Sequence, residues 1–461
     1  MLKTFSEILF FPRKYCYNFS SNFVNKQFQS STSAIMHQEV NEKKAKYDGR
    51  SKKRQWQDRR SDFRQSKISK TDENCETKSE PFERIKRRKY ALLLGYCGVG
   101  YFGMQRNPTM RTIEEDLFNA LFKTNHINQE CFDVVQNMQF QRAARTDKGV
   151  SAVRQVVSLK LPEQVDIESI NKELPEVIRV FGLKKVTKGF NSKTNCDSRT
   201  YSYTLPTVAF ADKDASVEQY GFRLNDETYD RVNRLLSMYV GTKNYHNFTS
   251  KKHHQDPSAN RYIKSFICER PFVRNDVEFA VLKVQGQSFM LHQIRKMVAL
   301  VLAVVRNHTN EATILHALTN EKVNVPRAPG LGLLLEFVHY DRYNFRYGED
   351  GIHEKLDWAE CENEVEAFKN KYILPVITET EIAEKEMVKW LSKLRGHRYD
   401  IFDEKDDAED EENAENANTE DDKGESRNDK ENEQIVEDEK DNKDEMKVES
   451  DKTILNTESI S

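Results

Sequence analysis

The sequence predicts an α+β fold with largely antiparallel strands, a basic arm before it and an acidic tail after it. Two periodicities support the fold: apolar residues alternate in several short segments and recur every three or four residues in others. Because these segments follow one another without regular strand-helix alternation, an α+β class is favoured over a parallel α/β class. The periodic segments lie between residues 90 and 400, and the charge changes sign beyond them.

The net charge of −3 hides two parts of opposite sign. The chain has 461 residues, with 72 Lys and Arg against 75 Asp and Glu. Residues 401–461 contain 25 acidic and 8 basic side chains, so this tail carries −17 and residues 1–400 carry +14. At 37% hydrophobic and 32% charged, the chain cannot bury enough apolar surface to order every segment. We therefore expect a disordered acidic tail at 401–461 and a basic body that suits a polyanionic partner.

Composition argues against a membrane protein and against a cysteine-stabilised one. The longest apolar run, Met297 to Val305, has nine residues, whereas a helix that crosses a bilayer needs about 20. The seven cysteines are odd in number, scattered and without a C-x-x-C pair, which argues against a disulfide framework and a thiolate zinc site. A reducing compartment is the natural interpretation.

The first 35 residues predict a mitochondrial transit peptide, with an ordinary disordered start as the alternative. They include four Lys or Arg and one acidic residue, Glu7, the acid-poor composition of such signals. A second start at Met36 would omit this signal and leave a disordered basic arm at 36–88. Because residues 41–90 hold 18 basic and 9 acidic side chains, the arm favours nuclear import or phosphate contact over a solvated linker. We therefore expect the protein in the nucleus and the mitochondrion.

The elements of the first half follow from periodicity and capping. A short apolar run ending in glycines predicts a strand at Tyr90–Tyr96, and Thr112 with Glu115 forms a capping box that opens a helix. The remaining elements are strands at Met138–Ala143 and Gln155–Leu161 around a tight turn, a capped helix near Asp166–Leu174, and strands at Val177–Val186 and Arg199–Leu205.

The second half continues with the same mixture. Its expected elements are a helix at Glu227–Val240, strands at Ile263–Glu269 and Val277–Val284, and a long buried helix at Leu291–Arg306. About 310 patterned residues predict two domains. Residues 351–400 have helical patterning with Trp358 and Trp390, which we assign to a C-terminal extension that packs on the core.

A glycine-rich segment follows the first strand. Gly98-Val-Gly-Tyr-Phe-Gly103 formally matches a dinucleotide fingerprint, but such a fingerprint opens a helix directly. Here Asn107-Pro108 intervenes and the helix begins near residue 113. A glycine-rich turn that shapes a cleft is therefore favoured over nucleotide binding.

Asp147 lies in a segment crowded with cations, namely Arg142, Arg145, Lys148 and Arg154. By spacing alone, Asp-Lys-Gly is an ordinary hairpin turn. The cations favour a catalytic interpretation, because they keep a carboxylate ionised and attract the backbone of RNA. An ionised Asp held among them can attack or deprotonate a sugar.

Two further segments carry candidate site residues. Alternation places Arg199, Tyr201 and Tyr203 on one face of a strand, where they form either a stacking surface for an unstacked base or core packing between strands. His292 and Arg295 begin the long helix. Arg295 either pairs with a buried carboxylate or lies on the solvent side, and His292 is more simply a structural histidine than an acid or base.

Together these segments resemble the successive motifs of the TruA-type tRNA pseudouridine synthases, in particular the eukaryotic nuclear and mitochondrial branch. They occur in the order of that family between residues 96 and 335, and the R-T-D-K-G-V run is specific. The matching segments are YCGVGYFGMQ at 96–105, RAARTDKGVSA at 142–152, KGFNSKT at 188–194, RTYSY at 199–203, GTKNYHNF at 241–248, FMLHQIR at 289–295 and APGLGLLL at 328–335.

The resemblance implies two ferredoxin-like domains that share a largely antiparallel sheet, with the active site in a positive cleft between them. Residues 89–205 would form the first domain, which carries Asp147, and residues 206–345 the second, which carries Arg295. Residues 346–400 would then be the helical extension.

The resemblance also implies the reaction. The C1′–N1 bond of a uridine in tRNA breaks, the uracil turns in place and C5 joins C1′, without a cofactor or a metal. Action on other RNAs, such as mRNA or snRNA, is also expected. Asp147 corresponds to the catalytic aspartate, either as nucleophile or by taking a sugar proton, and Arg295 to the cation paired with it.

The resemblance also implies two substrate-binding residues. Tyr201 corresponds to the tyrosine that stacks on the target base, and Arg145 to the arginine that holds the target nucleotide out of its helix. Arg142 and Lys148 are further substrate-binding candidates, because cations screen the repulsion between an Asp and the phosphate backbone. Arg199 is another candidate, because it lies beside Tyr201 and Tyr203 on the possible stacking face of their strand.

Two other functions stay open. One is an RNA-binding chaperone for tRNA shape without catalysis, and the other is an N-glycoside hydrolase that releases uracil. Intact Asp147, Tyr201 and Arg295 argue against the chaperone, since a binding protein does not need all three. The expected partner is tRNA. The sequence does not indicate whether the protein is a monomer or an oligomer.

Overall fold

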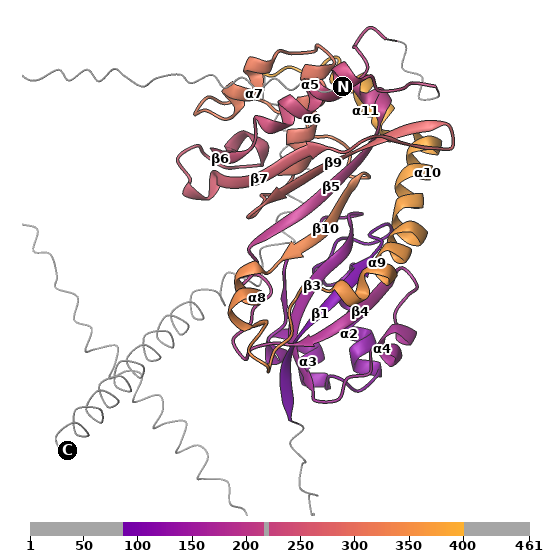
Figure 1. The fold of residues 1–461 in the computed structure, drawn as a ribbon, viewed down its shortest axis with the longest axis vertical. Helices are drawn as coiled ribbons and strands as arrows, with labels where there is room; N and C mark the ends of the chain where they lie inside the picture. The colour runs from indigo at the N-terminus through magenta and orange to yellow at the C-terminus, as the bar shows by residue number, and fades with distance from the viewer. Residues whose placement is uncertain (1–85, 216–220, 401–461) are drawn as a thin grey trace, which may run out of the picture. The chain divides into compact units, whose positions relative to one another are not determined.

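A single ten-stranded sheet forms the centre of the computed structural model, which describes residues 86–215 and 221–400 (Figure 1). Eight strands follow the order β4-β1-β3-β10-β5-β9-β7-β6, while β2 pairs with β3 and β8 pairs with β9. Every pairing is antiparallel except that of β10 with β3. The predicted α+β class with largely antiparallel strands is confirmed.

The strands have the following bounds. They are β1 (Arg87–Tyr96), β2 (Gln141–Arg142), β3 (Ser151–Pro162), β4 (Ile178–Lys185), β5 (Ser198–Pro206), β6 (Gly241–Asn244), β7 (Asn260–Cys268), β8 (Phe272–Arg274), β9 (Val277–Gly286) and β10 (Leu333–His339). The transit peptide, the basic arm and the acidic tail expected from the sequence lie outside the described residues.

Strand β10 joins the part of the sheet that carries Asp147 to the part that carries Tyr201. Leu335 of β10 pairs with Ala152 of β3 on one side and with Tyr201 of β5 on the other. Because neighbouring strands lie about 4.8 Å apart, the start of β3 and Tyr201 are separated only by the width of β10. The loop that contains Asp147 leads directly into β3 at Ser151, so it enters the sheet close to Tyr201.

The helices flank both ends of the sheet (Figure 1). Beside β4, β1 and β3 lie α2 (Ile113–Lys123), α3 (Gln129–Asp133) and α4 (Ile167–Glu173), and beside β9, β7 and β6 lie α5 (Asp226–Ser237), α6 (Gln293–Val305) and α7 (Glu311–Ala317). Helix α8 (Asp341–Tyr347) follows β10. Among the described residues, no helix has the length and apolarity needed to span a bilayer.

Two predicted helices are confirmed together with the reason for their bounds. The Thr112 side chain accepts a hydrogen bond from the Glu115 N–H, as the capping box predicted, and α2 begins at the next residue, Ile113. Helix α6 is buried on almost all sides, which fits a helix that is apolar around its whole circumference. Its two residues that are not fully buried are Arg295 and Lys296, both in its first turns.

The strand predicted at Met138–Ala143 is largely wrong. Met138 ends a 3-10 turn and Gln139 adopts a left-handed backbone conformation with φ of 53°. Such a residue interrupts an extended segment, so only Gln141 and Arg142 pair with β3. The division into domains at residue 205 stays a prediction. This residue belongs to β5, which pairs with both β9 and β10.

The helical patterning of residues 351–400 is confirmed. It contains α9 (Glu362–Phe368), a π-helical turn at Lys369–Ile373, α10 (Leu374–Glu384) and α11 (Glu386–Leu394). In Figure 1, α9 and α10 run along the sheet from the β4-β1-β3 end toward β9. Trp358, just before α9, is fully buried against Gly182 of β4, where an added Cβ would lie 3.1 Å from its ring.

The sequence suggested that Arg154 lies among the cations around Asp147, but the structure shows that it binds the C-terminal helix α9 instead. Its guanidinium is buried and pairs with Glu362 at 2.7 Å and Glu366 at 3.4 Å, both on α9. Arg154 points toward α9 because it belongs to β3, whose side chains alternate between the two faces of the sheet.

Candidate active site

Asp147 lies on a loop, residues 143–150. Hydrogen bonds to Tyr96 and Met104, both in the first half of the chain, hold this loop in place. The Met104 N–H donates to the Thr146 carbonyl at 3.1 Å. The Tyr96 hydroxyl and the Thr146 hydroxyl are 2.7 Å apart, and both are buried. Thr146 is therefore fixed from two sides, which sets where the neighbouring Asp147 leaves the backbone.

The glycine-rich turn at 98–103 packs directly against the backbone of this loop. A Cβ at Gly98 would lie 2.3 Å from the Val150 carbonyl oxygen, and Gly103 has φ of +97° and would place a Cβ 2.8 Å from the Thr146 oxygen. Only glycine allows such close approach of two backbones. Helix α2 begins only at Ile113, so the structure agrees with a supporting turn and not with a dinucleotide fingerprint.

Replacing Gly98 with Ala should therefore displace the Asp147 loop. The new methyl group would overlap backbone atoms of Val150, which cannot move without shifting the loop. We expect turnover to fall about 100-fold, since a misplacement of about 1 Å at a reacting group has an effect of that size. Gly189→Ala is the matched control, because a Cβ there meets nothing within 4 Å. Equal turnover of the two variants would contradict the role of the turn.

The second half of the chain brings His292 to Asp147. The His292 Nδ1 and Asp147 Oδ2 atoms are 3.7 Å apart, with 4% of the histidine side chain and 38% of the aspartate side chain exposed. His292 occupies the N-cap position of α6 with φ of 60°. The structure thus joins a loop of the first half to a helix of the second.

Arg295 lies on the same helix, one turn further along. Its Nε donates to the Ala328 carbonyl at 2.8 Å. A Cβ at Gly330 would lie 3.7 Å from the Arg295 Cζ, so the segment at 328–332 lies against the guanidinium. Both contacts help to fix the direction of the guanidinium.

Tyr201 is buried in the same region. It is 8% exposed, and its ring packs edge-to-face on Phe289 with 5.3 Å between ring centroids. Burial raises the pKa of Tyr201 to about 12; Arg199 opposes this effect and the charge of Asp147 adds to it. The phenol is therefore protonated at neutral pH.

Tyr203, the other aromatic of this strand face, belongs to the core. It is 1% exposed and its hydroxyl donates to the Pro329 carbonyl at 2.7 Å. Of the two alternatives for this face, core packing therefore applies to Tyr203. Tyr201 is the residue of the pair that approaches Asp147.

Arg199 and Arg142 hold the loop, although the sequence suggested them as substrate contacts. The Arg199 Nη2 donates to the Ala143 carbonyl at 2.6 Å and its Nη1 to the Gln287 carbonyl at 2.8 Å, which links the loop to the end of β9. Arg142 pairs with Glu114 of α2 through two hydrogen bonds, one of them 3.1 Å long.

The Arg142 pair is largely removed from water. Glu114 is 1% exposed and Arg142 15%. Burial raises the pKa of Glu114, while Arg142 and the Arg106 N–H, which donates at 2.9 Å, oppose this effect. The pair anchors β2 to α2 just before the Asp147 loop.

Arg145 and Lys148 are the predicted cations on the exposed side of the loop. The Lys148 ammonium lies 4.5 Å from the ring centroid of Phe102, and Phe102 itself is 47% exposed. A cation and an exposed aromatic ring side by side suit the backbone and the bases of single-stranded RNA. These side chains therefore form the solvent-facing rim of the site.

Two residues of the site were missed at the level of the sequence. Phe102 is part of the glycine-rich turn, and no periodic signal distinguishes an exposed Phe in a turn from a buried one. His292 was interpreted as a structural histidine, because the sequence contains nothing that indicates its contact with Asp147. Both assignments depend on contacts between distant segments.

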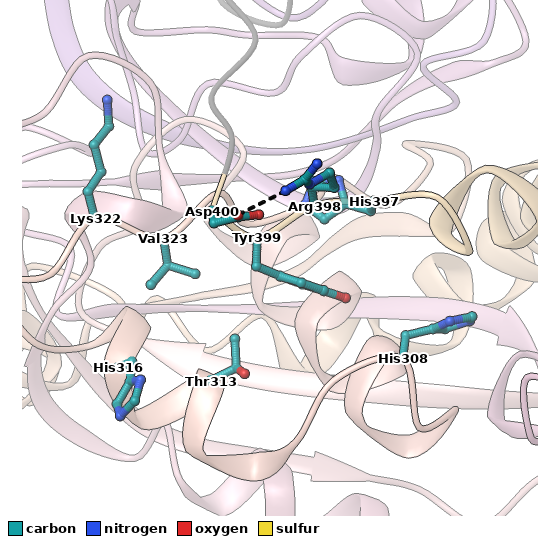
Figure 2. Close-up of a pocket in the computed structure, with 9 residues that line it drawn as sticks. All are labelled: His308, Thr313, His316, Lys322, Val323, His397, Arg398, Tyr399 and Asp400. Carbon is teal, nitrogen blue, oxygen red and sulfur yellow. Dashed lines mark hydrogen bonds and ion pairs between the residues drawn. The ribbon is translucent and has the colours of Figure 1, made fainter.

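A cavity of about 510 Å³ lies at the other end of α6 (Figure 2). It is lined by His308, Thr313, His316, Lys322, Val323, His397, Arg398, Tyr399 and Asp400. Thirteen helical residues separate its edge from His292, which corresponds to about 20 Å at 1.5 Å per residue. The cavity is therefore distinct from the Asp147 site. Within the described ranges, no group of three or more His, Cys, Asp or Glu side chains could hold a metal ion.

Known proteins resemble this chain over most of its described part. A mouse protein named pseudouridylate synthase 1 homolog is 53% identical over 324 residues, which cover 69% of this chain and 77% of the mouse protein. The human protein of that name is 55% identical over 312 residues, 67% of this chain and 73% of the human protein. The family model described as tRNA pseudouridine synthase matches residues 235–341.

The chain belongs to the tRNA pseudouridine synthase family. This confirms the resemblance inferred from the motifs. A relative from Saccharomyces cerevisiae, named tRNA pseudouridine synthase 1, is 32% identical over 404 residues, 70% of this chain and 74% of the yeast protein. Mouse, human and yeast relatives also agree with the eukaryotic branch. Within this pseudouridine synthase, α6 and the APGLG segment fall in the matched range 235–341, whereas Asp147 and Tyr201 precede it.

Proposed function

We propose that this pseudouridine synthase converts uridine to pseudouridine in tRNA, with Asp147 as the catalytic residue. The observation that carries the proposal is the 3.7 Å approach of Asp147 to His292, at the start of the helix that bears Arg295. Residues of the two halves meet there around one partly exposed carboxylate. The names of the relatives, which refer to pseudouridylate and to tRNA pseudouridine synthesis, support both the activity and the substrate.

The reaction rearranges one nucleotide. The C1′–N1 bond of the uridine breaks, a C5–C1′ bond forms, C5 loses a proton and N1 carries one in the product. No atoms are gained or lost and there is no net oxidation or reduction, so we propose that the reaction proceeds without a cofactor. Asp147 would act as the nucleophile at C1′ or as the base that takes a sugar proton, and both routes need the ionised carboxylate.

Tyr201 is suited to orient the base. Its phenol has a pKa of about 12 because it is buried, so at neutral pH it keeps the proton with which it could hydrogen-bond the base, and it offers a ring face. It could accept the C5 proton only after it had lost its own. We therefore assign Tyr201 to substrate orientation, with proton transfer from C5 as a later step that requires another acceptor to take the phenolic proton.

The RNA would approach from the exposed side of the loop. Arg145 and Lys148 are exposed there, and Phe102 lies beside Lys148. Arg142 and Arg199 are occupied with Glu114 and with backbone carbonyls, so we assign them to the loop and not to the substrate. An enzyme that acts on a base must take it out of the stack, and Arg145 is the exposed candidate for this step.

The remaining expectations extend the proposal. We propose that residues 89–205 and 206–345 form two ferredoxin-like halves with the active-site cleft between them, and that mRNA or snRNA also serve as substrates. We also propose nuclear and mitochondrial forms that start at Met36 and Met1. Fluorescent tagging of the two forms tests this location, and identical distributions would contradict it.

The function is tested with the full chain and tRNA that contains 5-tritiated uridine. We expect tritium to appear in the solvent, with one pseudouridine formed per tritium released, and mapping at nucleotide resolution should find the modified positions. Release of free uracil would instead indicate a glycoside hydrolase. Binding of tRNA without tritium release would indicate a non-catalytic chaperone.

A further inference from the structure

We propose that His292 is a positioning residue, which holds the Asp147 carboxylate in the orientation that reaches the sugar. This inference rests on the proposed function of Asp147. His292 would act through Asp147 and would not itself contact the uridine. The argument has three parts, namely the burial of the two side chains, the backbone of His292 and the hydrogen-bond chemistry.

Burial makes the histidine the fixed member of the pair. Its side chain is 4% exposed, whereas that of Asp147 is 38% exposed. The backbone before Asp147 is fixed through Thr146 by contacts within the first half, so the direction of the carboxylate depends on the two side-chain torsions of Asp147. A buried ring at 3.7 Å, supplied by the second half, is well placed to restrict them.

The backbone of His292 is unusual for the position it occupies. An N-cap residue is commonly extended and uses its side chain to cap the helix. His292 instead has φ of 60° and makes no capping hydrogen bond from its side chain. A left-handed conformation is uncommon for residues other than glycine, although histidine adopts it more readily than most. Here the conformation allows the chain to enter α6 while the ring faces Asp147.

The chemistry suits a positioning role. At 3.7 Å the two atoms are farther apart than in a hydrogen bond, which spans about 2.7–3.2 Å. Catalytic hydrogen bonds are often long without substrate and shorten in the complex. With its proton on Nδ1, His292 would then donate to Oδ2 of an ionised Asp147, and such charge-assisted bonds are the stronger ones.

Two substitutions separate the side chain from the backbone. Gly and Asn both tolerate a left-handed conformation, and the amide of Asn lies close to where Nδ1 of histidine lies. We expect His292→Gly to lower single-turnover pseudouridine formation about 10- to 100-fold, the range of a lost orienting contact. His292→Asn should recover the rate to within about fivefold, because it restores the donor. The dissociation constant for tRNA should change little in both variants.

A third variant guards against a folding defect in His292→Gly. His292→Asp has nearly the shape of His292→Asn but places a second carboxylate beside Asp147, and we expect it to be as slow as the glycine variant. Thermal unfolding of all three variants checks that they fold. The inference is overturned if the asparagine variant is no faster than the other two, or if none of the three differs from the unaltered protein. Absence of pseudouridine formation by the unaltered protein would refute the proposed function itself.

Discussion

Replacing Asp147 with Asn is expected to abolish pseudouridine formation. Asparagine keeps the shape of the side chain but provides neither a nucleophile nor a base, so both routes open to Asp147 are lost. We expect single-turnover tritium release to fall by at least about 1,000-fold, which corresponds to about 4 kcal/mol of transition-state stabilisation. Affinity for tRNA should stay within a few-fold, because the exposed cations of the rim remain.

The matched control is Asp166→Asn. Asp166 caps α4 through hydrogen bonds from the Glu168 and Ser169 N–H groups, and Asn is as good a cap as Asp. Both variants remove one carboxylate in the first half of the chain, so only the position differs. Activity of the Asp147 variant within tenfold of the unaltered protein, or equal losses in the two variants, would contradict the assignment.

Removing the Glu114 carboxylate is expected to have the largest effect on stability. In Glu114→Ala, the Arg142 guanidinium would keep its charge at a site that is 15% exposed, and the Arg106 N–H would lose its acceptor. Breaking a buried ion pair by removing one partner costs about 3–5 kcal/mol. We therefore expect the midpoint of denaturant unfolding to fall clearly. Turnover should fall as well, since Arg142 anchors β2 just before the Asp147 loop.

Glu115→Ala provides the comparison at the next position of the same helix. Glu115 pairs with Arg106 through a hydrogen bond of 3.1 Å, but 31% and 26% of the two side chains are exposed. A pair this accessible to water contributes about 0–1 kcal/mol. Equal shifts in the unfolding midpoint for the two variants would mean that burial does not distinguish the pairs, contrary to our expectation.

Local patterns in the sequence predicted most elements well. The capping box at Thr112 and the apolar stretch of α6 succeeded because hydrogen bonds and packing within a few residues determine a helix end and a buried helix. The strand predicted at Met138–Ala143 failed at Gln139, whose left-handed backbone interrupts an apolar alternation that otherwise suggests a strand. The pattern reports which side chains avoid water, and does not report the backbone torsion of a single residue.

The candidate site divides in the same way. Asp147, Tyr201 and Arg295 were identified through motifs, since the residue types and their order are themselves the signal. The occupation of Arg142 by Glu114, of Arg154 by α9, and of Arg199 by the Ala143 and Gln287 carbonyls was not predictable. In each case the partner is 28 or more positions away along the chain.

The sequence by itself determined the mixed fold class, the main helices and strands and the family to which this chain belongs. Tertiary structure alone decided which cations face solvent and which hold the Asp147 loop, and it placed His292 beside Asp147. The physical reason is the distance along the chain over which each interaction acts. Capping and periodicity involve residues a few positions apart, whereas burial and the pairing of charges depend on which distant segments the sheet brings together. Strand β10, which lies between β3 and β5, is the element that makes those segments neighbours.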